Sequence, residues 1–132
     1  MNPLTREWIS KAEGDFATAE REVRARKKPN YDAACFHAQQ CAEKYLKAFL
    51  QEKDIPFGKT HNLVALLDQA LEAFSSLELL RPDLQRLNIY AVQFRYPGES
   101  ADKDTAREAV SVCRIVRERL RTTLGLRARR DN

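Results

Sequence analysis

The sequence predicts an all-α protein, an up-and-down bundle of four to five helices in a single domain spanning residues 1–132. Two observations lead to this fold class. Apolar residues recur at intervals of three and four in five separate segments, and no segment alternates apolar with polar residues over the length of a strand. The composition is 43% hydrophobic and 32% charged, with four glycines and five prolines among 132 residues, which is typical of a helical domain with one core.

The first two helices are separated by Pro29. We expect the first over residues 5–27 with Thr5 as its N-cap, and the second over residues 30–53 with Asn30 as its N-cap. Because the connection is short, the two helices should form an antiparallel hairpin. The apolar stripes are Trp8, Ala12, Ala19 and Val23 in the first helix and Tyr31, Ala34, Ala38, Cys41, Ala42, Tyr45 and Phe49 in the second.

A third helix follows a turn at residues 55–58. Thr60 is its expected N-cap, and the helix should begin near His61 and stay amphipathic as far as Phe74. Its apolar residues are Leu63, Leu66, Leu67, Ala70, Leu71 and Phe74.

Two more helices complete the bundle. Pro82 suits the first position of a helix over residues 82–94. The last helix covers residues 102–124 and ends at Gly125, which favours a left-handed cap. Their expected core residues are Leu84, Leu87, Ile89 or Tyr90, and Phe94, followed by Ala106, Ala109, Val110, Cys113, Val116, Leu120 and Leu124.

The three cysteines form no C-x-x-C pair, so we expect free buried thiols. Cys35, His37 and Cys41 could suggest a metal site, but no fourth ligand is at hand, and we expect neither metal nor cofactor. No apolar run approaches the roughly 20 residues of a membrane span, and no signal-peptide pattern opens the chain. These features favour a cytoplasmic protein that does not bind membranes.

Positive charge is concentrated towards the end of the chain. The formal net charge is +4, and eight arginines against two glutamates lie between Arg107 and Arg130. A basic helix can attract a phosphate backbone through counterion release. A solvated helix face followed by a frayed basic tail at residues 126–132 explains the same pattern.

Asp15 interrupts the apolar stripe of the first helix. One interpretation is a surface acid at the edge of the stripe. The other is a buried carboxylate, which would need a basic partner on the second helix because an unpaired buried charge is costly.

The second helix offers such partners on one face. His37, Gln40, Lys44 and Lys47 follow each other at steps of three, four and three. A solvated surface would explain a polar face, but Phe36 lies on the same side. We therefore favour an interface or the wall of a pocket.

Arg95 and Tyr96 lie at the end of the fourth helix. Arginine suits bidentate binding of phosphate or carboxylate, and tyrosine offers a stacking face and a hydroxyl group. Arg95 could equally cap helix carbonyls. His61 is expected to belong to the cap region of the third helix, and no phosphate-binding glycine loop or nucleophile motif is present.

The chain resembles the HEPN family (higher eukaryotes and prokaryotes nucleotide-binding) over nearly its whole length. The segments that carry the resemblance are residues 8–15 with Ala19, the string Phe36-His37-Ala38-Gln39-Gln40-Cys41-Ala42-Glu43-Lys44-Tyr45-Leu46-Lys47-Ala48, then Lys59-Thr60-His61-Asn62-Leu63, and Tyr90 with Arg95-Tyr96-Pro97. The resemblance implies an HEPN-like helical bundle that dimerises, and a small nucleotidyltransferase as partner.

Many members of this family are ribonucleases that use an arginine followed, after four to six residues, by a histidine. Here no arginine precedes His37 or His61 at that spacing, and no histidine follows Arg95. The resemblance therefore implies a non-catalytic module in which His37, Gln40, Lys44, Lys47, Arg95 and Tyr96 bind a nucleotide, RNA or the partner, as in a toxin–antitoxin pair.

Two alternatives remain. One is a metal-independent endoribonuclease toxin that uses Arg95 and Tyr96, with His37 brought in by the fold. The other is a purely structural interaction domain, in which Asp15 pairs with Lys44 or His37 and His61 also has a structural role.

Overall fold

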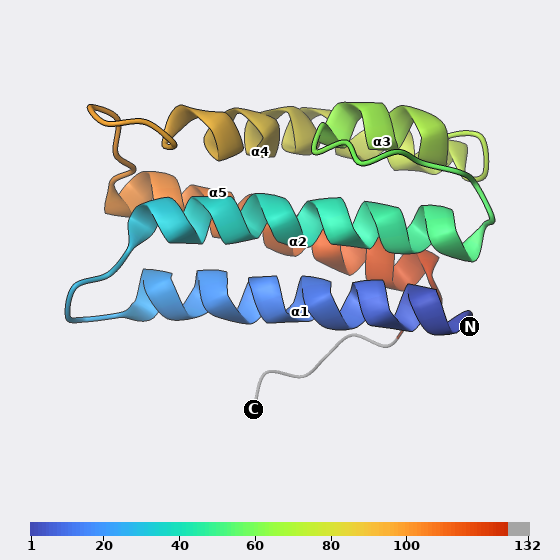
Figure 1. Ribbon diagram of the computed structural model, residues 1–132, viewed down its shortest axis with the longest axis horizontal. Helices are drawn as coiled ribbons and strands as arrows, with labels where there is room; N and C mark the ends of the chain where they lie inside the picture. Colours follow the sequence, from blue (N-terminus) through green and yellow to red (C-terminus); the bar gives the residue numbers. More distant parts are fainter. Residues whose placement is uncertain (127–132) are drawn as a thin grey trace.

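The computed structural model describes residues 1–126, which form an all-α bundle (Figure 1). The helices described are α1 (Pro3–Arg24), α2 (Tyr31–Glu52), α3 (Leu63–Ala70), the short 3-10 helix η1 (Ser75–Leu80), α4 (Arg81–Gln93) and α5 (Lys103–Thr123). The all-α prediction is confirmed. The predicted basic tail lies outside the described residues, except for Leu126.

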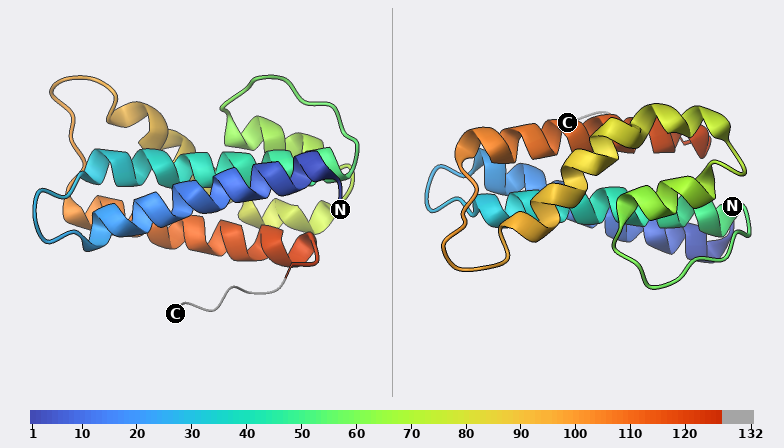
Figure 2. Two further views of the ribbon diagram at one scale, coloured as in Figure 1. Left: turned by 60° about the horizontal axis from the view of Figure 1, so that its bottom comes forward. Right: turned by 90° about the horizontal axis from the view of Figure 1, so that it is seen from above.

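Helix α2 is the centre of the bundle. It packs against α1, α3, α4 and α5, and α1 runs antiparallel beside it, as the short connection predicts (Figure 1). Helices α3 and α4 lie on the opposite side of α2 from α1, and α5 closes the bundle along its back, as the two views of Figure 2 show. This central position explains why most α2 side chains are buried.

Helix α1 begins earlier than the sequence predicts. Asn2, not Thr5, is the N-cap, and its side chain accepts a hydrogen bond of 2.8 Å from the Leu4 N–H. Pro3 then takes the first helical position, where its missing N–H costs nothing. Thr5 consequently lies inside the helix and is fully buried.

Helix α3 is shorter than predicted at both ends. Its N-cap is Asn62 rather than Thr60, because the Asn62 side chain accepts hydrogen bonds from the N–H groups of Val64 and Ala65 at 3.0 and 3.3 Å. The helix ends at Ala70, and a turn follows before η1. The amphipathic spacing up to Phe74 therefore spans a helix and a turn, which periodicity alone does not separate.

The core confirms most of the predicted stripes, with several differences. Phe74, an expected core residue of the third helix, is 42% exposed, and Trp8 is only partly buried. Phe16 is buried although the predicted first stripe omitted it, and Ile89 is 59% exposed, so Tyr90 rather than Ile89 packs against the core. All three cysteines are free and buried, as expected. Of the helices described, none combines the length and the hydropathy needed to cross a membrane.

Candidate functional site

A hollow of about 310 Å³ opens between α2, the segment that leads into α3, and α4. We name it the Arg95 hollow. Its lining residues are Gln39, Gln40, His61, Asn62, Asn88, Ala91, Val92 and Arg95. Most of these side chains carry amide, imidazole or guanidinium groups, so the lining of the hollow is polar.

Glu43 lies buried beneath this hollow, with 3% of its surface exposed. Its carboxylate accepts a hydrogen bond of 2.9 Å from the Nδ1–H of His61 and another of 3.1 Å from Lys47. Gln39 and Gln40 also donate to it, at 3.4 and 3.3 Å. The buried charge is therefore paired and hydrogen-bonded, which makes its burial tolerable.

Glu43 also sets the orientation of His61. Because a carboxylate can only accept, Nδ1 of His61 carries the proton in this contact, and Nε2 of the neutral ring is then an acceptor. The His61 side chain is 70% exposed, so the rest of the ring is open to a ligand. Gln39 donates to the His61 carbonyl at 2.9 Å and fixes the backbone of this segment.

Asn62 and Asn88 form the rim towards α3. Asn88 accepts a hydrogen bond of 2.9 Å from the Leu63 N–H and donates one of 3.0 Å to Asn62. The same Asn62 oxygen caps α3, so α4 is tied to the start of α3 through polar side chains. This network fixes the wall of the hollow that faces His61.

Arg95 follows the end of α4 and is exposed. Within residues 1–126, no ion pair or hydrogen bond engages its guanidinium group. An exposed arginine without a carboxylate partner keeps its donors available for an anionic ligand.

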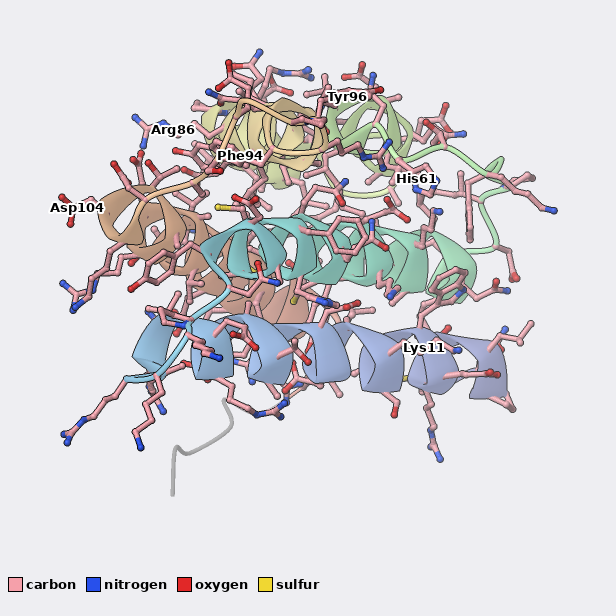
Figure 3. All side chains as sticks on the ribbon, turned by 60° about the vertical axis from the view of Figure 1, so that its left-hand side comes forward. Lys11, His61, Arg86, Phe94, Tyr96 and Asp104 are labelled. Carbon is pink, nitrogen blue, oxygen red and sulfur yellow. The ribbon has the colours of Figure 1, made fainter. Side chains whose placement is uncertain are left out.

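Arg95 also borders a second hollow, of about 330 Å³, on the other side of Ala91. We name it the aromatic hollow. It is lined by Asn30, Asp32, Ala33, Phe36, Tyr90, Ala91, Phe94 and Arg95. Phe94 and His61 both lie on the side of the molecule where α2 meets α3 and α4, whereas Lys11 lies on α1, away from both hollows (Figure 3).

Asp15 proves to be a buried carboxylate with basic partners, 7% exposed. Lys44 donates to it at 2.5 Å, and Nδ1 of His37 lies 2.7 Å from its other oxygen. The expectation of a partner on the second helix is thus confirmed. Because both bases bind α1 through this carboxylate, His37 and Lys44 lie outside the residues that line the Arg95 hollow.

The predicted polar face of the second helix therefore divides into separate parts. Of its four residues, Gln40 alone lines the Arg95 hollow. Lys47 is buried between Glu43 and the Trp8 ring, with its ammonium 5.5 Å from the ring centroid, and this corrects the idea of a binding lysine there. Tyr96 is 67% exposed and lines neither hollow.

Sequence reasoning missed three residues of the site, namely Glu43, Asn62 and Asn88. Glu43 belongs to the string that carries the family resemblance, but it looks like any surface acid of an amphipathic helix. One signal was available in the sequence, because Glu43 lies one turn after Gln39 and one turn before Lys47, so an amide, a carboxylate and an ammonium group share one helix face.

A second polar cluster joins α1, α2 and α5 inside the bundle. Glu13 accepts two hydrogen bonds from Arg117, at 2.7 and 2.8 Å, and one from the Tyr45 hydroxyl. Burial and the Glu13 charge raise the pKa of Tyr45 well above its ordinary value, while the Glu13 carboxylate raises that of Arg117. The cluster holds three helices together and is separate from both hollows.

Fold and site together define a small helical bundle with a polar site on its central helix. The chain belongs to the HEPN family, since the HEPN domain model matches residues 5–123. A crystal structure of an archaeal HEPN homologue superimposes with a TM-score of 0.64 at 21% identity, covering 91% of this chain and 97% of that one. At this identity the likeness shows the fold alone. No curated protein matches the chain.

Proposed function

We propose that this HEPN chain is a binding module that holds a nucleotide or RNA by a phosphate group in the Arg95 hollow. The observation that carries the proposal is the exposed Arg95 guanidinium, which no carboxylate engages within residues 1–126, in one hollow with the side-chain N–H groups of Asn62 and Asn88. Guanidinium and amide donors that converge on one hollow match the several acceptor oxygens of a phosphate.

The size of the effect follows from the contacts. A hydrogen bond to a charged group contributes about 1.5–3 kcal/mol, so loss of Arg95 should weaken binding about 10- to 100-fold. The net charge of +4 adds an attraction that does not depend on the site. A specific site is therefore distinguished from general charge attraction by comparing the affinity lost on replacing Arg95 with the affinity lost on replacing another exposed arginine.

The test is fluorescence anisotropy with a labelled single-stranded RNA and with a labelled nucleotide, on the wild type, Arg95→Ala and Arg107→Ala. Arg107 is exposed on α5 and serves as the control of equal charge. We expect the Kd to rise about 10- to 100-fold for Arg95→Ala and to stay near the wild-type value for Arg107→Ala. Equal losses in both variants would reduce the binding to general charge attraction and refute the site.

The same proposal includes a protein contact on α4, either with a second copy of the chain or with a small nucleotidyltransferase. Two apolar residues of α4 support it, because Ile89 and Val92 are 59% and 61% exposed, and Val92 lines the Arg95 hollow. Sedimentation of the wild type and of Ile89→Asp tests the first possibility. A wild type that is monomeric at all concentrations leaves the nucleotidyltransferase as the partner to be tried in co-purification.

A second candidate function is metal-independent cleavage of RNA, favoured by the Glu43–His61 contact of 2.9 Å in the same hollow as Arg95. Nε2 of His61 would take the proton of a ribose 2′-hydroxyl, whose oxygen bonds to the adjacent phosphorus. The bond from phosphorus to the 5′-oxygen then breaks, and water protonates the leaving oxygen. His61 replaces His37 in this role, because His61 lines the same hollow as Arg95 and His37 does not.

A denaturing-gel time course of labelled RNA in EDTA tests this candidate. If His61 transfers the proton, His61→Ala should slow cleavage about 10²- to 10⁴-fold while the anisotropy still reports bound RNA. Intact RNA at stoichiometric wild-type protein ends the catalytic candidate and leaves the binding module in place.

A further inference from the structure

The two hollows are neighbours along the seam between α2 and α4. They share Ala91 and Arg95, so the guanidinium group stands at the boundary between them. The residues around them differ in chemistry, because the Arg95 hollow is lined with amides and the imidazole of His61, while the aromatic hollow is lined with three aromatic rings. A ligand that fills both hollows therefore needs an anionic group at Arg95, a polar part on one side of that group and a flat aromatic part on the other.

We propose that the aromatic hollow is a base-stacking subsite for single-stranded RNA, with Arg95 on the phosphate that links the stacked nucleotide to the next one. The proposal rests on the proposed function and names its substrate class: a ligand of at least two nucleotides, in preference to inorganic phosphate or a mononucleotide. The second nucleotide then lies in the Arg95 hollow beside His61 and Gln40.

The aromatic residues come from α2 and from the end of α4. Phe36 of α2 is 39% exposed, while Tyr90 of α4 and Phe94, the C-cap residue of that helix, stack on each other with ring centroids 6.5 Å apart and planes 16° from parallel. The Phe36 ring meets the His37 ring edge-on at 5.2 Å between centroids, and that contact helps to hold it in place. Aromatic rings at a hollow of this kind are the usual platform for unstacked bases.

Charge decides which part of a nucleotide enters each hollow. Asp32 lines the aromatic hollow, where its carboxylate accepts a hydrogen bond of 2.7 Å from the Ala101 N–H. A fixed negative charge repels phosphate, so the uncharged base is the part that fits there. Arg95 provides the positive charge at the boundary, and the phosphate therefore lies next to it.

The experiment uses Phe36, which is partly exposed and can be changed without opening the core. Phe36→Leu keeps an apolar side chain but removes the ring, and Phe36→Tyr keeps the ring. By anisotropy with labelled single-stranded RNA, we expect Phe36→Leu to bind about 5- to 100-fold more weakly and Phe36→Tyr to bind like the wild type. Circular dichroism confirms that both variants are folded.

A matched RNA with a series of abasic sites provides the ligand control. The wild type should lose affinity for it, and Phe36→Leu should then bind it as the wild type does, because no base remains to stack. Equal binding of normal RNA by Phe36→Leu and by the wild type would overturn the subsite. A Phe36→Leu variant with unchanged RNA affinity but an altered oligomeric state in sedimentation would also overturn it, since a second copy of the chain would then cover the hollow.

Arg95→Ala separates this inference from the proposed function. If Arg95→Ala loses RNA binding while Phe36→Leu does not, the stacking subsite fails and phosphate binding at Arg95 stands. If Arg95→Ala binds RNA as the wild type does, the proposed function fails and the subsite fails with it.

Discussion

Replacing Lys44 with alanine tests whether the polar contacts between α1 and α2 serve stability or ligand binding. Lys44 donates to Asp15 at 2.5 Å, and the Asp15 side chain is only 10% exposed. Removing one partner of a buried ion pair costs about 3–5 kcal/mol. Here His37 still contacts Asp15 at 2.7 Å and the Lys44 side chain is 22% exposed, so we expect a smaller loss, about 2 kcal/mol.

That loss converts into a shift of the unfolding midpoint. Unfolding entropy is about 2.1 cal/mol/K per residue, or about 0.28 kcal/mol/K for a chain of 132 residues. A loss of about 2 kcal/mol therefore lowers the Tm by about 7 °C. RNA affinity should not change, because neither Asp15 nor Lys44 lines the Arg95 hollow.

Thermal unfolding followed by far-UV circular dichroism measures the Tm, and anisotropy well below that temperature measures RNA binding. Lys11→Ala is the matched control, since Lys11 is exposed on α1 and its removal changes the net charge equally. A Tm equal to that of Lys11→Ala would refute the structural role of the pair. An unchanged Tm with lost RNA binding would make Lys44 a ligand-binding residue.

Three further predictions concern the scaffold. Asn30→Ala removes the side-chain cap of α2, in which the Asn30 oxygen accepts a hydrogen bond of 2.9 Å from the Ala33 N–H. The free energy of unfolding should fall by about 1 kcal/mol, which lowers the Tm by about 4 °C. An unchanged Tm would mean that the cap contributes nothing to stability. Arg117→Met breaks the paired hydrogen bonds to buried Glu13 and should cost about 3 kcal/mol in urea unfolding, so a loss below that of Asn30→Ala would contradict the burial argument. Burial raises the pKa of the Cys35 thiol from 9.0 to about 12. As the pH rises from 9 to 12 the unfolded chain therefore loses this proton first, and the free energy of unfolding falls. That free energy should fall less steeply with pH in Cys35→Ala than in the wild type, and identical pH dependences would contradict the raised pKa.

The sequence alone determined the fold class and most of the core. Apolar residues at helical spacing specify which face of each helix is buried, and this information is local. The Asn30 cap and the stop at Gly125, whose φ is 77°, were predicted for the same reason, because each depends on a few neighbouring residues. Even the partner of Asp15 could be narrowed to the second helix, since a carboxylate within an apolar stripe needs a base nearby.

Only the tertiary structure decided the composition of the site. His61 and Arg95 are far apart in sequence, and a motif search in which histidine must follow arginine cannot pair them. They line one hollow because the chain passes from α2 through α3 and returns along α2 as α4. The burial of Lys47 was likewise hidden, because helical spacing gives the direction of a side chain but not the helix that covers it. Helix faces are encoded locally, whereas the partners of each face depend on how the whole chain packs.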